Sequence, residues 1–323
     1  MALQFTSRNQ LLANLAGQRA NFLNAIFGLT TDQLNQPLWD DWSSRSLLPH
    51  IALWDAREAD RLHKIAAGQS GHIANIDVDA QNAAWHAQHK ATSVDAGMAM
   101  LLKERNGLIN AVAAVSDEQW VATFKTQHHD AFSPLYCTNN SIEHDEDHAN
   151  DVTKWRNATD QEALQLGPKS VLVALLRAGL HDFEATAAAV AETVAADTAI
   201  CGHWNLKQLV AHMASWETHA AATLENMVAA PVAQTDAEID AENELWVNER
   251  LHLPIADLWQ EYRSGRQRMI ELVNNMSDEQ LGAKIADCWA DEDLAYYWGS
   301  YWVSHDMEHA KELRGLYCKK LEG

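Results

Sequence analysis

Histidine and tryptophan residues recur along this chain at a fixed offset. The pair His144-x-x-x-His148 is followed by His305-x-x-x-His309, so both histidines repeat after 161 residues (305 − 144 and 309 − 148). His50 and His212 are separated by 162 residues. The same offsets of 161 or 162 relate Phe22 to Phe183, Trp42 to Trp204, Trp54 to Trp216, Trp85 to Trp246, and the turn Ser116–Gln119 to Ser277–Gln280. An offset of about half of 323 residues predicts an internal duplication.

Each half carries the pattern of four long amphipathic helices. In the first half, apolar residues at three- and four-residue spacing predict helices at 7–28, from Ser43, at 93–115 and through His144 and His148. In the second half Asn205 replaces Ser43 as the predicted N-cap, and Pro254 stands where Ser93 opened the third helix. We find no strand pattern. The sequence predicts an all-α chain of two tandem four-helix bundles, with domains at 1–157 and 168–323 joined by a polar linker that ends at Gly167-Pro168.

The composition excludes several classes of partner. A formal charge of −21 argues against nucleic acid, because phosphate binding needs clustered Lys and Arg. The sequence holds no apolar run long enough for a membrane span and no signal-peptide pattern at residues 1–6. Four scattered cysteines (Cys137, Cys201, Cys288 and Cys318) form no C-x-x-C pair, as expected of reduced thiols. We therefore expect a cytoplasmic protein.

The repeated histidines are candidate metal ligands. His50 shares a helix face with Leu47, Ile51 and Trp54, so it points inward, and an i,i+4 histidine pair lies on one face of the last helix. Bundles build metal sites from inward side chains on facing helices. The predicted ligands are His50, His144 and His148 in one half and His212, His305 and His309 in the other. Three neutral imidazoles suit Zn, Ni, Fe or Co and leave a position open for water or substrate. The alternative is that His50 and His212 are core histidines and that the pairs face solvent.

Polar residues near the histidines have alternative roles. Asp145 and Asp306 follow the first histidine of each pair, and they either orient imidazole N–H groups or belong to the solvated helix face. Asn82 and Asn243 each precede a tryptophan by three residues, and we expect helix caps or loops rather than pocket-lining roles for both.

Each half resembles the DinB-like (DinB/YfiT-type) superfamily of four-helix bundles. The superfamily pattern is a tryptophan shortly before a helix with an inward histidine, followed by an H-x-x-x-H pair on the last helix. Trp42 and Trp204 stand at the tryptophan position ahead of the two histidine trios. The motifs Asn82-x-x-Trp85 and Asn243-x-x-Trp246, with the two Ser-Asp-Glu-Gln turns, are most similar to the ClbS/DfsB-like branch.

The resemblance implies a divalent metal held by three histidines and chemistry on electrophilic small molecules. The leading hypothesis is a metal-dependent thiol S-transferase or hydrolase, with one ion per half and a small-molecule substrate or low-molecular-weight thiol as partner. The alternatives are a binding or self-resistance protein that sequesters a compound without turnover, and a chain in which one half is only structural. DinB-like proteins are often dimers, so the two halves are expected to form the equivalent pair internally or the chain to form a homodimer.

Overall fold

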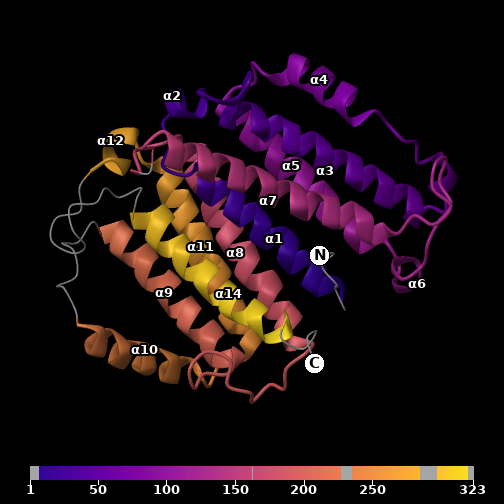
Figure 1. Ribbon diagram of the computed structural model, residues 1–323. Helices are drawn as coiled ribbons and strands as arrows, with labels where there is room; N and C mark the ends of the chain where they lie inside the picture. Colours follow the sequence, from indigo (N-terminus) through magenta and orange to yellow (C-terminus); the bar gives the residue numbers. More distant parts are fainter. Residues whose placement is uncertain (1–6, 162, 227–234, 284–296, 319–323) are drawn as a thin grey trace. The chain divides into compact units, whose positions relative to one another are not determined.

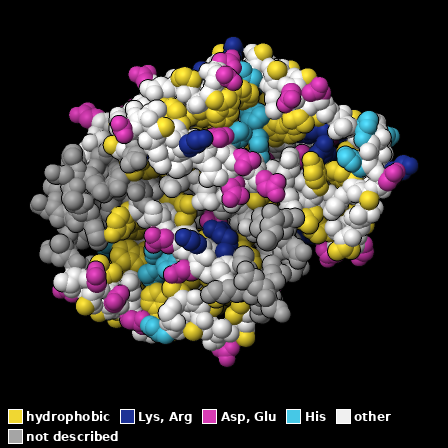
Figure 2. Space-filling model, viewed as in Figure 1, with side chains coloured by type: hydrophobic (Ala, Val, Ile, Leu, Met, Phe, Trp, Pro, Cys, Tyr) yellow, Lys and Arg dark blue, Asp and Glu magenta, His cyan; other side chains and the backbone are white. Residues whose placement is uncertain are grey.

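The computed structural model describes residues 7–161, 163–226, 235–283 and 297–318. They form α-helices almost throughout (Figure 1), which confirms the all-α prediction. None of the described helices combines the length and the apolarity that crossing a membrane requires. Acidic side chains are spread over the face shown in Figure 2, in keeping with the formal charge of −21.

The chain divides into two compact units. Unit 1 comprises Met1–Leu3 and Asn21–Ala174, and unit 2 comprises Gln4–Ala20 and Leu175–Gly323. The N-terminal part of the first helix therefore belongs to the second unit, a feature that the periodicity did not reveal. The domain limits at 1–157 and 168–323 stay a prediction.

The long helices of unit 1 lie where the hydrophobic periodicity placed them. The long helices of the first half are α1 (Arg8–Ile26), which enters unit 1 only from Asn21, and α3 (Ser44–Ala66), α5 (Val94–Ala114) and α7 (Pro134–Ala158). Helix α3 packs chiefly against α5 and also against α7 and α4 (Val78–His89). The apolar face of α3 is fully buried at Leu47, Leu48 and Leu62, so the same helix that carries His50 is anchored in the core.

Short elements of unit 1 were missed by the periodicity. Between the first two predicted helices lies α2 (Thr31–Leu34), which Thr30 opens with a capping box. Strands β1 (Pro37–Trp39) and β2 (Trp42–Ser43) then form an antiparallel hairpin. The two-residue turn includes Asp40 at φ 44°, the left-handed conformation that aspartate tolerates. Strands of two and three residues are too short to show alternation.

Unit 2 has the same order of long helices. They are α8 (Lys169–Ala191), α9 (Leu206–Asn226), α11 (Ile255–Asn275) and α14 (Val303–Cys318), with α10 (Asp236–Arg250) outside them and a π-helical turn at Tyr297–Trp302 leading into α14. Helix α9 packs chiefly against α11 and also against α10. The core joins Phe183 of α8, Leu209 and Met213 of α9 and Tyr262 of α11.

The predicted helix starts are confirmed by their caps. Ser43 accepts from the Ser46 backbone N–H, and Asn205 accepts from the Gln208 backbone N–H at 3.1 Å. Ser116 and Ser277 open α6 (Asp117–Trp120) and α12 (Asp278–Leu281) with capping boxes. Local side-chain chemistry therefore fixes where these helices begin.

Candidate metal centres

Three histidines converge in unit 1. His50 extends from α3, and His144 and His148 lie one turn apart on α7. Nε2 of His144 is 3.0 Å from Nε2 of His50 and 3.0 Å from Nε2 of His148. His50 and His148 are buried, and His144 is partly buried. The alternative of a solvent-facing pair and an isolated core histidine is therefore wrong for this trio.

Unit 2 repeats this arrangement with His212 from α9 and His305 and His309 from α14. Nε2 of His305 is 3.0 Å from Nε2 of His212 and 3.1 Å from Nε2 of His309. All six histidines predicted from the sequence are thus brought together, three in each unit.

Burial keeps the inner imidazoles neutral. It lowers the pKa of His50 to about 3, with a smaller effect from His148, and the pKa of His212 to about 3, with a smaller effect from His309. Burial and His212 also lower the pKa of His305 well below its usual range. Neutral imidazoles have the lone pairs that metal coordination requires.

The donor set fits a divalent ion. For metal–nitrogen bonds of about 2.1 Å, two ligands at 90° are about 3.0 Å apart and two at the tetrahedral angle about 3.4 Å apart. The observed 3.0–3.1 Å separations match the smaller value. The Nε2 atom of a neutral imidazole either donates or accepts one hydrogen bond, so the central Nε2 of each trio cannot form a hydrogen bond with both of its neighbours. A shared cation removes that conflict.

Carboxylates orient the outer histidines, and the sequence reasoning missed them. Nδ1 of His148 lies 3.1 Å from Asp151 Oδ2, and Nδ1 of His309 lies 3.0 Å from Glu312 Oε2. A carboxylate at Nδ1 holds the proton there and leaves the Nε2 lone pair directed at the other two histidines. The signal that could have found them is the offset, because Asp151 and Glu312 are also 161 residues apart (312 − 151).

The aspartates within the pairs have neither role expected of them. Asp145 and Asp306 are 0% and 1% exposed, so they are not on a solvated face. Asp145 Oδ2 accepts from Arg105 Nη2 at 2.6 Å, and Asp306 Oδ2 lies 2.8 Å from Arg266 Nη1. Hydrophobic periodicity could not show that these aspartates pair with arginines, because the arginines lie on a different helix.

A second buried carboxylate completes each ion-pair cluster. Arg105 Nε donates to Asp55 Oδ2 at 2.9 Å, and Arg266 Nε donates to Glu217 Oε2 at 3.0 Å. In unit 2, Tyr262 donates to Asp306 Oδ1 at 2.8 Å. Burial raises the pKa of Glu217 to about 7, against the opposing effect of Arg266.

Glycines allow the helices to approach at the unit 2 cluster. A Cβ at Gly179 would lie 2.6 Å from Asp306 Oδ2, and one at Gly265 would lie 2.6 Å from Glu217 Cβ. Because both neighbours are buried and held by Arg266, neither could move away at low cost. The clusters thus fix the helices that carry the histidines.

Asn82 and Asn243 were expected at caps or loops, and this was wrong. Both lie inside helices, α4 and α10. Asn82 Oδ1 accepts from Trp54 Nε1 at 3.0 Å, and Asn243 Oδ1 accepts from Trp216 Nε1 at 2.8 Å. Each asparagine therefore ties its helix to a tryptophan whose ring lies edge-on to a histidine of the trio.

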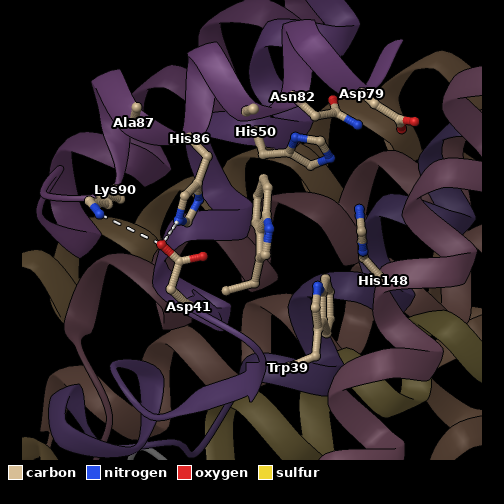
Figure 3. Close-up of a pocket in the computed structure, with 11 residues that line it drawn as sticks. Trp39, Asp41, His50, Asp79, Asn82, His86, Ala87, Lys90 and His148 are labelled. Carbon is tan, nitrogen blue, oxygen red and sulfur yellow. Dashed lines mark ion pairs between the residues drawn. The ribbon is translucent and has the colours of Figure 1, made fainter.

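A cavity of about 550 Å³ opens beside the unit 1 trio. Figure 3 shows His50 and His148 on its wall, with Trp39 next to His148. The Trp39 ring stacks on His148 at 6.1 Å and 10°, and the Trp42 ring lies 4.9 Å from His50. The lining comprises Trp39, Asp41, Trp42, His50, Asp79, Asn82, Ala83, His86, Ala87, Lys90 and His148.

Unit 2 differs at the positions that cover the trio. At the 162-residue offset Cys201 stands for Trp39, and its Sγ lies 3.9 Å from Nδ1 of His309, on the side of the ring away from the other histidines. Burial and Glu312 raise the pKa of this thiol to about 11. Cys137 is also a free thiol, whereas Cys288 lies outside the described residues.

Comparison with known proteins gives one family match. Residues 176–300 match the family model of the mycothiol maleylpyruvate isomerase N-terminal domain. The match supports the DinB-like superfamily. This family is associated with mycothiol-related, metal-binding DinB-like enzymes. Comparisons with curated proteins and with solved structures find no match.

The matched segment covers part of the unit 2 trio. It includes His212 and ends at Ser300, before His305 and His309. The convergence of those two histidines on His212 is therefore an observation from the structure, independent of the match. The relation of the chain to the ClbS/DfsB-like branch stays a prediction.

Proposed function

We propose that this protein is a metal-dependent enzyme of the DinB-like type that acts on electrophilic small molecules by thiol S-transfer or hydrolysis. The observation that carries the proposal is that, in both units, the Nε2 atom of one histidine lies 3.0–3.1 Å from the Nε2 atoms of the other two. A trio of this kind leaves coordination positions open, as catalytic sites require.

Each group of residues at the two trios has a separate role in the proposed chemistry. His50, His144 and His148 would hold one ion, and His212, His305 and His309 a second; Zn, Ni, Fe and Co all suit the donors. The bound ion supplies Lewis acidity and favours the thiolate or hydroxide form of a nucleophile. Asp151 and Glu312 hold the outer imidazoles in the ligating tautomer. The cavity of about 550 Å³ in unit 1 offers room for a small substrate beside the trio.

We also propose that the two units arose by duplication, with domains near 1–157 and 168–323 and the ClbS/DfsB-like branch as the nearest relatives. Residues outside the original motifs support the duplication. Arg105 and Arg266 are 161 residues apart (266 − 105), and both bind the aspartate that follows the first histidine of the pair. Asp55 and Glu217 are 162 apart (217 − 55) and bind the same arginines.

Metal analysis of protein purified without a histidine tag tests the proposed function. We expect about one divalent ion per trio in the wild type, and loss of one ion in each of His144→Ala and His305→Ala. The control is His63→Ala, because His63 is an exposed histidine on the same helix as His50. Wild-type protein that holds no ion after equilibration with Zn, Co, Ni and Fe would refute the proposal.

A second candidate function is sequestration of a compound in the cavity without turnover. The aromatic rings of Trp39 and Trp42, which line the cavity, favour this function because they offer apolar surface to a bound compound. Sequestration predicts that a bound compound raises the melting temperature equally in wild type and in His144→Ala. A stabilisation that disappears with His144 would instead support binding at the metal.

A further inference from the structure

The unit 1 cavity has a second cluster of polar groups beyond the trio. His86 of α4 and Asp41 of the β1–β2 turn lie on its wall (Figure 3). Nε2 of His86 is 3.1 Å from Asp41 Oδ2, and Lys90 Nζ is 3.6 Å from the same oxygen. The Trp42 ring lies 4.1 Å from His86 and 4.9 Å from His50, so it separates this cluster from the trio.

His86 is poorly satisfied for a buried side chain. It is 9% exposed, and its Nδ1 has no hydrogen-bond partner among the described residues. Its Nε2 makes no hydrogen bond within the described residues either, although it lies 3.1 Å from Asp41 Oδ2. In a neutral imidazole one nitrogen carries the proton and the other a lone pair that can accept. A buried imidazole nitrogen left without a partner costs stability, so such a group on a cavity wall indicates a ligand donor.

The charges on the cavity wall favour a cation. Asp41 and Asp79 place carboxylates on opposite sides of the cavity (Figure 3). Among the described lining residues, the ammonium group of Lys90 balances only one of these two negative charges. The pKa of Asp41 is lowered, chiefly through its interaction with His86, so it is ionised at neutral pH. Indole faces such as those of Trp39 and Trp42 also attract cations.

Unit 2 lacks this cluster at the corresponding positions. Val247 stands for His86 (86 + 161) and His203 for Asp41 (41 + 162). His203 pairs with Glu244 at 2.9 Å, but its side chain is 73% exposed rather than buried on a cavity wall. The two units therefore share the trio and differ in what surrounds it.

We propose that the unit 1 cavity binds a small thiol that carries a primary ammonium group, with the thiol directed to the histidine trio and the ammonium held by Asp41 and His86. A primary ammonium has three donors. It can donate to the Asp41 carboxylate and to His86 Nδ1 while it stays close to the Trp42 ring. This inference rests on the proposed function, because the thiol end requires a metal at the trio.

Three thiols of similar size and different charge test the inference: cysteamine (cationic), 2-mercaptoethanol (neutral) and 3-mercaptopropionate (anionic). Their binding to Co²⁺-loaded protein is followed by the thiolate-to-cobalt charge-transfer absorbance. His305→Ala protein retains only the unit 1 trio, and His144→Ala protein retains only the unit 2 trio. The three thiols differ in acidity, so they bind any cobalt–histidine site with different affinities. For each thiol, the affinity of the unit 1 site is therefore divided by the affinity of the unit 2 site.

We expect that normalised ratio to favour cysteamine over 2-mercaptoethanol by about five-fold, the size of one partly exposed charge pair, and to place 3-mercaptopropionate last. Asp41→Asn and His86→Val, made separately in the His305→Ala protein, should lower the preference and leave 2-mercaptoethanol binding unchanged. Asp60→Asn removes the same charge from the exposed face of α3 and should have no effect. Retained far-ultraviolet circular dichroism shows that each variant is folded.

The outcomes separate the two proposals. Equal normalised affinities for the three thiols, or a cysteamine preference that survives in both Asp41→Asn and His86→Val, overturn the ammonium site alone. Absence of a thiolate band with any thiol overturns this inference at its thiol end but leaves metal-dependent hydrolysis standing. Absence of binding of Co²⁺ and also of Zn, Ni and Fe overturns the proposed function and this inference with it.

Discussion

Replacement of His50 by glutamine should flatten the acid dependence of the stability of metal-free protein. Burial lowers the pKa of His50 to about 3 in the folded state. In the unfolded chain an ordinary histidine has a pKa of about 6.5. Below pH 6.5 this imidazole is therefore protonated in the unfolded state but not in the folded state. The contribution of the neutral imidazole to the free energy of unfolding is complete above pH 6.5 and is lost as the pH falls towards 3.

The size of the effect follows from the two pKa values. Between pH 7.5 and pH 5 the unfolded state is favoured through this one histidine by about 2 kcal/mol. That is a large share of the roughly 5–15 kcal/mol by which domains are stable. Glutamine does not titrate in this range, so the variant should lose about 2 kcal/mol less than the wild type over the same interval.

Urea unfolding with a chelator present, followed by tryptophan fluorescence, measures the difference. For an m-value of about 2 kcal/mol/M, the shift of the midpoint between pH 7.5 and pH 5 should be about 1 M smaller in His50→Gln than in wild type. His63→Gln is the matched control, because His63 is exposed on the same helix. An equal pH shift in wild type and His50→Gln would refute the reasoning.

Three further predictions concern other parts of the sites. Asp151→Ala and Glu312→Ala should each keep the metal stoichiometry but weaken the affinity at their own trio about 10- to 100-fold, measured by competition with a chromogenic chelator; unchanged affinity would exclude an orienting role. Arg266→Leu leaves two buried carboxylates without their cation and should cost about 3–5 kcal/mol in urea unfolding, whereas a neutral result would show that the cluster adds no net stability. Cys201, with a pKa of about 11, should be alkylated slowly at pH 7.5 and faster as the pH rises, measured by peptide mass spectrometry; rapid alkylation at pH 7.5 would contradict the raised pKa.

The long helices and their starts could be predicted because they depend on neighbours in sequence. Apolar spacing placed α3 and α5, and a side-chain cap such as Ser43 marks its helix wherever the chain lies in space. The β1–β2 hairpin and α2 were missed, because elements of two to four residues are too short to show a period.

The histidine ligands could be predicted for a different reason. A trio that occurs twice at one offset is improbable as chance, so the repeat linked His50 to His144 and His148 across almost a hundred residues. The offset of 161 residues also relates Asp151 to Glu312, but an acidic residue in a chain this rich in Asp and Glu does not stand out as a repeat.

The sequence by itself determined the helical class, the two candidate trios and the expected ligand chemistry. Only the tertiary structure decided what surrounds the trios. Asp145 lies one residue from His144, yet it points to Arg105 on another helix, because adjacent helical residues face directions about 100° apart. His86 and Asp41 meet on a cavity wall although 45 residues separate them (86 − 41). Side chains brought together by packing leave no periodic trace in the chain, and such groups distinguish the two otherwise similar units.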